Sequence, residues 1–191
     1  MIDELTFLSG KTVNLRGLLL SDLEGPYVSW LNDAEVCRYN SHHVFPYSRE
    51  QAEDYIKSVY AGKTILALAI VLKESGEHIG NIALQNIHPL ARSAEFAILV
   101  GAKDQWGKGF AKEAAKLICR HGFNELNLHR IYCGTNAENN GMQKLASYLG
   151  MQLEGRSREA QFKDGRFVDV LHYGLLRSEF VLKFRSADGI S

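Results

Sequence analysis

The sequence has few of the features that are typical of secreted proteins, membrane proteins or nucleic-acid-binding proteins. It has 3 cysteines and 3 prolines among 191 residues. The cysteines (Cys37, Cys119 and Cys133) are odd in number and scattered, so we expect a reduced, cytoplasmic protein. Lys plus Arg and Asp plus Glu each number 22, and this zero net charge disfavours a protein that works mainly on nucleic acid or on an anionic membrane.

Long apolar runs are also missing. No run approaches the ~20 residues that a membrane-spanning helix needs. The N-terminal stretch MIDELTFLSG has neither the basic start nor the sustained apolar core of a signal peptide. The length supports one domain with a real core, which we expect to cover residues 1–191, with an ordered part at about 10–180 and a flexible tail at about 186–191.

Hydrophobic periodicity and turn residues predict an alternation of strands and helices. The signals include an N-cap at Ser21-Asp22, a capping box of Ser48 and Gln51, a C-terminal glycine at Gly150 and an Asp-Gly turn at 164–165. The predicted strands are 12–18, 64–72, 79–87, 93–100, 129–135, 152–162 and 167–176, and the predicted helices are 23–31, 35–39, 49–60, 109–124 and 139–149. One β-α-β unit, made of 93–100, 109–124 and 129–135, therefore lies inside an otherwise antiparallel sheet. This order predicts an α+β fold with the long helix on one face of the sheet.

Two glycines stand where the predicted strand 93–100 gives way to the predicted helix 109–124, in the stretch WGKGFA. The first turn of a helix has unpaired N–H groups and the positive end of the helix dipole, so it favours an anion. Gly107 and Gly109 would let a phosphate approach the backbone, and Lys108 and Lys112 would add positive charge. A simple tight turn is the competing interpretation.

Two common phosphate-binding motifs do not match this loop. A Walker loop needs Gly-Lys-Ser/Thr, but Phe110 follows Gly109. A dinucleotide fold needs a third small residue where Lys112 stands, and the strands before the loop form a meander rather than a β-α-β unit. NAD is therefore disfavoured.

Several short motifs recur in an order that resembles the GNAT superfamily of acetyl-CoA-dependent N-acetyltransferases, and within it the RimJ/RimL-type branch. The resemblance covers about residues 10–180. It rests on Trp30–Asp33, Ile79–Ile82, Ala94–Phe96, Trp106–Ala114, Asn139 with Gly150 eleven positions later, Glu154-Gly155 and Val168–Val170. It implies a GNAT-like mixed, mostly antiparallel sheet with one central, splayed pair of parallel strands and helices on both faces.

The resemblance also implies a site for acetyl-CoA as cosubstrate. The family's pyrophosphate motif, Gln/Arg-x-x-Gly-x-Gly/Ala, falls on Trp106, Gly109 and Ala111, so its first position departs from the pattern. The pantetheine arm would lie between strands 93–100 and 129–135. The residues so implied in cofactor binding are Ile98, Leu99, Val100, Trp106, Gly107, Lys108, Gly109, Phe110, Ala111, Lys112 and Asn139.

Transfer to an amine needs a group that takes a proton, because an ammonium of pKa near 10 cannot attack a thioester. Glu95, a carboxylate in an apolar strand, is the candidate base; a structural or solvated glutamate is the alternative. Many GNAT enzymes use a hydroxyl as acid at positions that here are Ala146 and Met142. Tyr148 is the nearest remaining candidate acid, although a packed role or unaided departure of the thiolate also fits.

The acceptor is expected opposite the cofactor, near the loop 39–47 and the last hairpin. We expect it to meet Tyr39, His42, His43 and Arg158, with Arg156 and Arg166 as further cations for an acidic acceptor. Adjacent histidines without a cysteine pair make no metal site, so no metal is expected. The acceptor stays open among a protein N-terminus, an amino sugar or its nucleotide form, an aminoglycoside and a polyamine. A non-catalytic acyl-CoA-binding module and a different nucleotide binder are the alternative functions, and a homodimer is left open.

Overall fold

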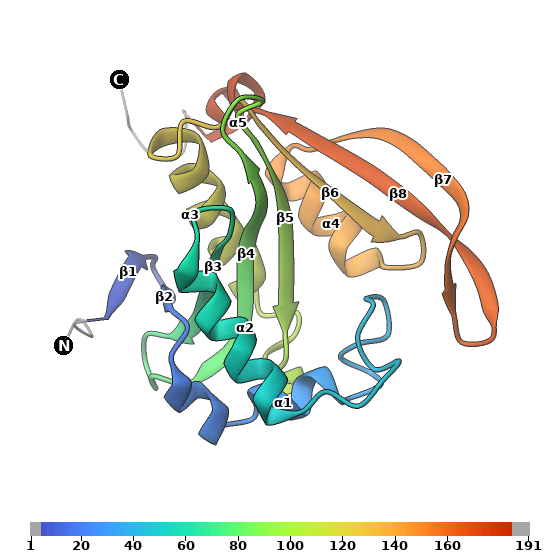
Figure 1. The fold of residues 1–191 in the computed structure, drawn as a ribbon. Coiled ribbons are helices and arrows are strands. Elements are labelled where there is room, and N and C mark those ends of the chain that lie inside the picture. Colours follow the sequence, from blue (N-terminus) through green and yellow to red (C-terminus); the bar gives the residue numbers. More distant parts are fainter. Residues whose placement is uncertain (1–4, 185–191) are drawn as a thin grey trace.

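The computed structural model describes residues 5–184 and contains one eight-stranded sheet with helices on both faces (Figure 1). Its spatial order is β1-β2-β3-β4-β5-β6-β8-β7. All neighbouring strands are antiparallel except β5 and β6, which are parallel. The strands are β1 (Thr6–Ser9), β2 (Val13–Gly17), β3 (Leu66–Leu72), β4 (His78–His88), β5 (Ser93–Val100), β6 (Arg130–Asn136), β7 (Gln152–Lys163) and β8 (Arg166–Leu176). The α-helices are α1 (Tyr27–Leu31), α2 (Arg49–Ala61), α3 (Phe110–Asn124), α4 (Asn140–Leu149) and α5 (Arg177–Phe184).

Local sequence signals account for most of these boundaries. Ser48 and Gln51 form the predicted capping box of α2. Helix α4 ends at Gly150, which has φ 87° and so adopts the left-handed conformation that glycine tolerates. Asp164 and Gly165 both have positive φ, 50° and 78°, which is the two-residue turn that matches the twist of a β-hairpin.

The N-terminal third differs from the prediction in three ways. The predicted helix 23–31 is broken: a 3₁₀ helix (Leu20–Glu24) ends at Gly25, and α1 begins only after Pro26. The predicted cap at Ser21-Asp22 is wrong, because Asp22 lies inside the 3₁₀ helix and turns back to accept a hydrogen bond from the N–H of Leu19. The predicted helix 35–39 is a run of turns.

One strand and one α-helix were not predicted at all. The edge strand β1 is four residues long, too short for a clear periodic pattern. Helix α5 is held by Phe180, which packs against Phe123 and Phe184, and this tertiary contact is not revealed by local sequence. The predicted tail at about 186–191 lies outside the described residues.

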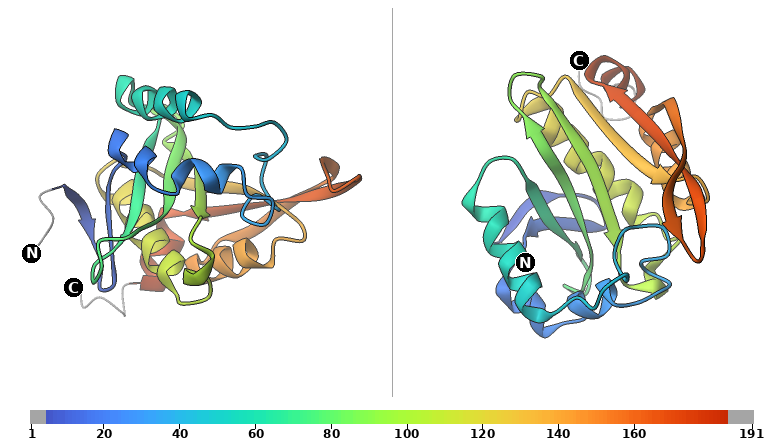
Figure 2. Two further views of the ribbon diagram at one scale, coloured as in Figure 1. Left: turned by 90° about the horizontal axis from the view of Figure 1, so that it is seen from below. Right: turned by 45° about the vertical axis from the view of Figure 1, so that its right-hand side comes forward.

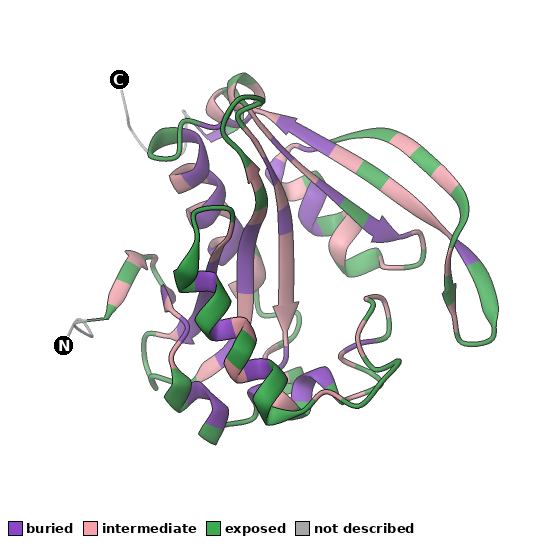
Figure 3. Cartoon of the chain, in the orientation of Figure 1, coloured by how far each residue is buried: buried purple, intermediate pink, exposed green. Residues whose placement is uncertain are grey.

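Two apolar clusters hold the layers together. The larger one fills the space between the sheet and α3, α4 and α5, and the smaller one lies under α1 and α2 on the opposite face (Figures 2 and 3). The predicted helices on both faces are therefore confirmed. The β7–β8 hairpin extends beyond both clusters, and much of it is exposed (Figure 3).

The parallel pair opens along its length, as predicted. Residues 93–95 of β5 pair with residues 130–132 of β6, and the two strands then separate. Beyond that point β5 stays paired with β4 as far as Val100, whereas β6 stays paired with β8 as far as Asn136. The sheet is therefore split between two neighbouring strands that point the same way (Figure 1).

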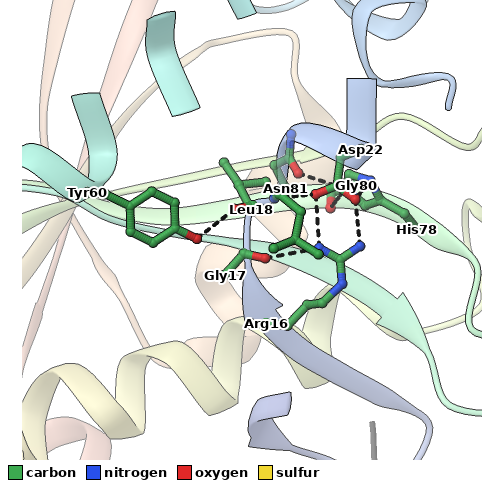
Figure 4. Close-up of polar contacts among 9 residues, drawn as sticks. Arg16, Gly17, Leu18, Asp22, Tyr60, His78, Gly80 and Asn81 are labelled. Carbon is green, nitrogen blue, oxygen red and sulfur yellow. Dashed lines mark hydrogen bonds and ion pairs between the residues drawn. The ribbon is translucent and has the colours of Figure 1, made fainter. Parts of the chain in front are cut away.

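A buried polar cluster fixes the end of β2 to β4 (Figure 4). Asp22 accepts two hydrogen bonds from the guanidinium of Arg16, at 2.9 and 2.6 Å. His78 Nδ1 lies 3.6 Å from Asp22 Oδ1, and its Nε2 contacts Asn81 Oδ1 at 2.8 Å and the carbonyl of Gly80 at 3.0 Å. Burial alone would raise the pKa of Asp22, but the hydrogen bonds from Arg16 and Leu19 and the nearby His78 lower it overall.

Candidate active site

A cleft of about 730 Å³ lies at the end of β5, beyond the rung at which β5 and β6 separate. One wall is the end of β5 with the loop that leads into α3, a second is the start of α4, and the third is the turn region 35–40. The lining residues are Glu35, Val36, Arg38, Tyr39, Asn40, Ile98, Leu99, Val100, Gln105, Trp106, Gly107, Gly109, Phe110, Ala111, Lys112, Asn139, Gly141, Met142, Lys144 and Leu145. The volume is typical of a small-molecule or cofactor site.

The glycine loop, residues 106–112, has the geometry of an anion cradle. Gly107 and Gly109 have φ 78° and 92°, a conformation in which a side chain would be strained. The positions where their Cβ atoms would lie have nothing within 4 Å, so the backbone faces open space. Within residues 5–184, the N–H groups from Gly107 to Ala111 make no hydrogen bond to the protein. Five backbone donors at and before the start of α3 are therefore available to a ligand, and the helix dipole there also favours an anion.

Side chains of this loop tie it to the strand and add charge. The indole N–H of Trp106 donates to the carbonyl of Val100 at 2.8 Å, which fixes the loop to the end of β5. Lys112 lines the cleft, whereas Lys108 is turned to Gln105, whose Oε1 accepts from its Nζ at 3.0 Å. Lys112 is therefore the lysine of this loop that lines the cleft, and Lys108 lies outside the described lining.

The strand end and α4 complete the cofactor side. Ile98, Leu99 and Val100 all line the cleft and are half-buried. The side chain of Asn139 caps α4 by accepting from the N–H of Met142 at 3.0 Å, so its oxygen is engaged while its amide NH₂ remains at the cleft. All of the predicted cofactor residues except Lys108 therefore come together around one cavity.

Glu95 is not among the described residues that line the cleft. It is half-buried and stands between Gln85 of β4 and Tyr132 of β6, at the last paired rung before the strands separate. Its Oε2 accepts a hydrogen bond from Asn86 Nδ2 at 2.8 Å. Burial raises the pKa of the Cys133 thiol to about 12, and the negative charge of Glu95 adds to this shift. The carboxylate therefore sits where the opening between the strands begins.

The candidate acid lies apart from the cleft. The ring of Tyr148 packs at 5.8 Å from the ring of Phe184, and Lys112 Nζ lies 5.4 Å from its centre. Tyr148 is not among the described residues that line the cleft. The positions where the family usually has a hydroxyl are Met142, in the lining, and Ala146, which is fully buried.

The predicted acceptor residues divide into two groups. Tyr39 lines the cleft, but His42, His43 and Arg158 are not in its described lining. His42 lies 5.9 Å from the ring of Tyr47, and its pKa is lowered by burial and then by the ammonium of Lys163. Arg158 is exposed on β7.

Some residues of the site escaped the sequence analysis. Arg38, Asn40 and Glu35 line the cleft because the chain from 33 to 40 turns instead of forming a helix. Lys144 lies one turn into α4 and also reaches the cleft. Lys144 follows the predicted cofactor residue Asn139 by five positions, so both lie near the start of α4. This spacing is the only sequence signal that could have placed Lys144 at the cleft.

Residues 5–184 contain neither a candidate metal site nor a membrane-spanning helix. No group of three or more His, Cys, Asp or Glu side chains there could hold a metal ion. In the same range no helix is long and apolar enough to cross a membrane.

Comparison with known proteins identifies the family. Residues 12–152 match the family model for the acetyltransferase (GNAT) domain. An uncharacterized N-acetyltransferase, p20, of Bacillus licheniformis is 32% identical over 173 residues, which cover 88% of this chain and 94% of p20. A spermidine N-acetyltransferase from Vibrio cholerae, solved in complex with CoA and spermine, is 26% identical with a TM-score of 0.82 over 90% of this chain and 99% of that chain.

A RimL ribosomal-protein acetyltransferase solved with CoA is similar in fold only: it is 16% identical, with a TM-score of 0.79 over 87% of this chain and 95% of that chain. The predicted fold, the enzyme class and acetyl-CoA as cosubstrate are thus confirmed, whereas the narrower RimJ/RimL assignment is not. The chain belongs to the GNAT acetyltransferase family and is an acetyl-CoA-dependent N-acetyltransferase.

Proposed function

We propose that the cleft binds acetyl-CoA with its pyrophosphate on the glycine loop and that an amine attacks the thioester directly. The observation that carries this is the run of five N–H groups from Gly107 to Ala111 that donate to no group within residues 5–184, beside two glycines whose Cβ positions are open, at the start of α3. Such donors bind phosphate oxygens without a side chain between them. Lys112 adds a cation to the same wall.

The opening between β5 and β6 suits the pantetheine arm. Ile98–Val100 face the cleft on a strand that has lost its partner on that side, so backbone N–H and C=O groups are available to the amides of the arm. One N–H of this stretch would also polarise the thioester carbonyl and stabilise the negative charge that develops on its oxygen. The amide NH₂ of Asn139 closes the opposite side.

Glu95 is the proposed base. Its carboxylate lies at the rung where the strands begin to separate, which leaves a path for water between it and the acceptor amine. The bond from Asn86 holds one oxygen, and the other is left to accept a proton through that water. Attack by the neutral amine forms the amide bond and breaks the C–S bond, and the CoA thiolate leaves without an acid, since thiols have a pKa near 8.5.

Calorimetry with acetyl-CoA, CoA and NAD tests the binding step. We expect acetyl-CoA and CoA to bind and NAD not to bind. Release of thiol from acetyl-CoA in the presence of primary amines then tests the reaction. Tight binding without thiol release for any amine would favour the alternative, a non-catalytic acyl-CoA-binding module.

Four narrower statements stay predictions. They are the RimJ/RimL-type branch, a cytoplasmic location, a homodimer, and a single domain over residues 1–191. The relation to a spermidine N-acetyltransferase makes a polyamine one candidate acceptor.

A further inference from the structure

Three carboxylates near the cleft are engaged by cations. Glu35, in the lining, accepts from Lys103 Nζ at 3.0 Å, and the same ammonium binds Asp33 at 2.9 Å. Glu138, beside the cleft, is held by both terminal nitrogens of Arg166 at 2.7 Å. These bonds lower the pKa of Asp33 and Glu138 and keep both side chains ionised and occupied.

Among residues 5–184, two cations at the same place form no ion pair, although the charge of Arg38 contributes, after the hydrogen bond from Arg166, to the lowered pKa of Glu138. Arg38 lines the cleft, and its guanidinium carbon lies 5.7 Å from the ring centre of Tyr39. Lys163 crosses from the tip of the β7–β8 hairpin and donates to the carbonyls of Asn40 and His42 at 3.3 and 3.2 Å. Within the described residues 5–184, neither Arg38 nor Lys163 forms an ion pair.

A small recess joins these groups to the cleft. Its lining residues are Arg38, Tyr39, Asn136, Glu138, Lys163, Asp164, Arg166 and Val168. Arg38 and Tyr39 also line the cleft, so the recess adjoins the space where an acceptor would lie. It holds three cations against two carboxylates, and one of these carboxylates is bound by Arg166. The volume is only about 20 Å³, so a ligand would sit at its mouth.

We propose that the acceptor amine carries an acidic group, either phosphate or carboxylate, which Arg38 and Lys163 bind at the mouth of this recess. This inference rests on the proposed function. The planar fork of arginine matches the oxygens of either group, and the remaining N–H of the Lys163 ammonium adds a charged donor. A polycation such as spermidine would bring its further ammonium groups next to Arg38 and Lys163, where like charges repel. This chain is therefore expected to differ in acceptor from the spermidine N-acetyltransferase that it resembles.

Matched pairs of amines test the proposal. Glucosamine 6-phosphate is compared with glucosamine, and 4-aminobutyrate with butylamine, so each pair differs by one acidic group. Spermidine is the polycation. Thiol release from acetyl-CoA gives kcat/KM for each, and calorimetry on the CoA-bound protein gives their affinities without turnover. The two pairs distinguish a phosphate from a carboxylate as the source of the anion.

The acidic member of at least one pair should be preferred about 10–100-fold, the range expected for hydrogen bonds to a charged group. Arg38→Gln should remove most of that preference while the affinity for acetyl-CoA stays within about twofold. Lys57→Gln is the control, because it also removes one positive charge but lies on the exposed face of α2, paired with Glu53.

The outcomes separate the two proposals. Selective binding of the acidic amine with no thiol release would support the acidic ligand and overturn the proposed reaction. Equal use of both members of each pair, preference for spermidine, or the same loss in Arg38→Gln and Lys57→Gln would overturn the acidic acceptor and leave the acetyltransferase standing.

Discussion

The substitution Gly109→Val separates the role of the glycine loop in binding from its role in folding. Gly109 has φ 92°, and a Cβ at this position would meet nothing within 4 Å. The Cβ of the valine therefore meets no protein atom, and the expected cost in the free protein is backbone strain. A non-glycine residue in such a conformation costs of order 1–3 kcal/mol. For a chain of this size that corresponds to a fall in Tm of roughly 2–12 °C.

The loss in affinity has a separate origin. The Cβ and both methyl groups would project into the space where the pyrophosphate is proposed to lie, or the loop would relax and turn its N–H groups away. Loss of one or two hydrogen bonds to a charged phosphate costs at least about 1.5 kcal/mol, which is about tenfold in Kd or more. Calorimetry with acetyl-CoA measures the affinity, and thermal unfolding measures the stability.

Gly76 supplies a matched control. It has φ 74°, also with nothing within 4 Å of its Cβ position, and it lies in the turn between β3 and β4, outside the lining of the cleft. Gly76→Val should lower Tm by a similar amount and leave the affinity within about twofold. An unchanged Kd in a folded Gly109→Val variant would show that the pyrophosphate does not bind on this loop.

Three further outcomes are expected. Glu95→Gln should lower kcat about 10²–10⁴-fold with the affinity for acetyl-CoA nearly unchanged, and a rate that recovers in part at high pH; normal kcat at pH 7 would make Glu95 structural. Asp22→Ala should lower the free energy of unfolding in urea by about 3–5 kcal/mol, because the buried guanidinium of Arg16 loses the carboxylate that accepts two of its hydrogen bonds, and a loss under 1 kcal/mol would contradict this. The pKa values of His78 and Asp22 are both lowered by folding, so the unfolded state binds more protons. Stability in urea should therefore be full above about pH 6.5, decline below it as His78 of the unfolded chain protonates, and decline again below about pH 4 through Asp22; stability that rises on acidification would refute this.

The sequence predicted the parts of the fold that local signals govern. The capping box of α2, the glycine at the end of α4 and the Asp-Gly hairpin turn each set a boundary through the backbone of a few residues. The glycine loop was predicted for the same reason, since Gly107 and Gly109 mark unusual φ before a helix. Signals of this kind need no knowledge of the rest of the chain.

Long-range contacts explain what the sequence did not predict. The region 33–40 has helical spacing but forms turns, in which Asp33 accepts from the N–H groups of Glu35 and Val36 and binds Lys103, 70 positions away. These contacts carry Arg38 into the cleft, and no local pattern marks it. Likewise the bond from Lys163 to the loop carbonyls joins two segments that are more than 120 positions apart.

The positions at which related enzymes carry an acidic hydroxyl lack one in this chain, and the proposed mechanism therefore depends on a base more than on an acid. The position three residues after Asn139 is Met142, the position seven residues after it is the buried Ala146, and Tyr148 packs against Phe184 instead of the cleft. A thiolate of pKa near 8.5 is a good leaving group without protonation, whereas an ammonium of pKa near 10 cannot attack until it loses a proton. The harder step in this chain is therefore deprotonation of the acceptor. That requirement gives the carboxylate of Glu95, at the rung where β5 and β6 separate, its proposed role.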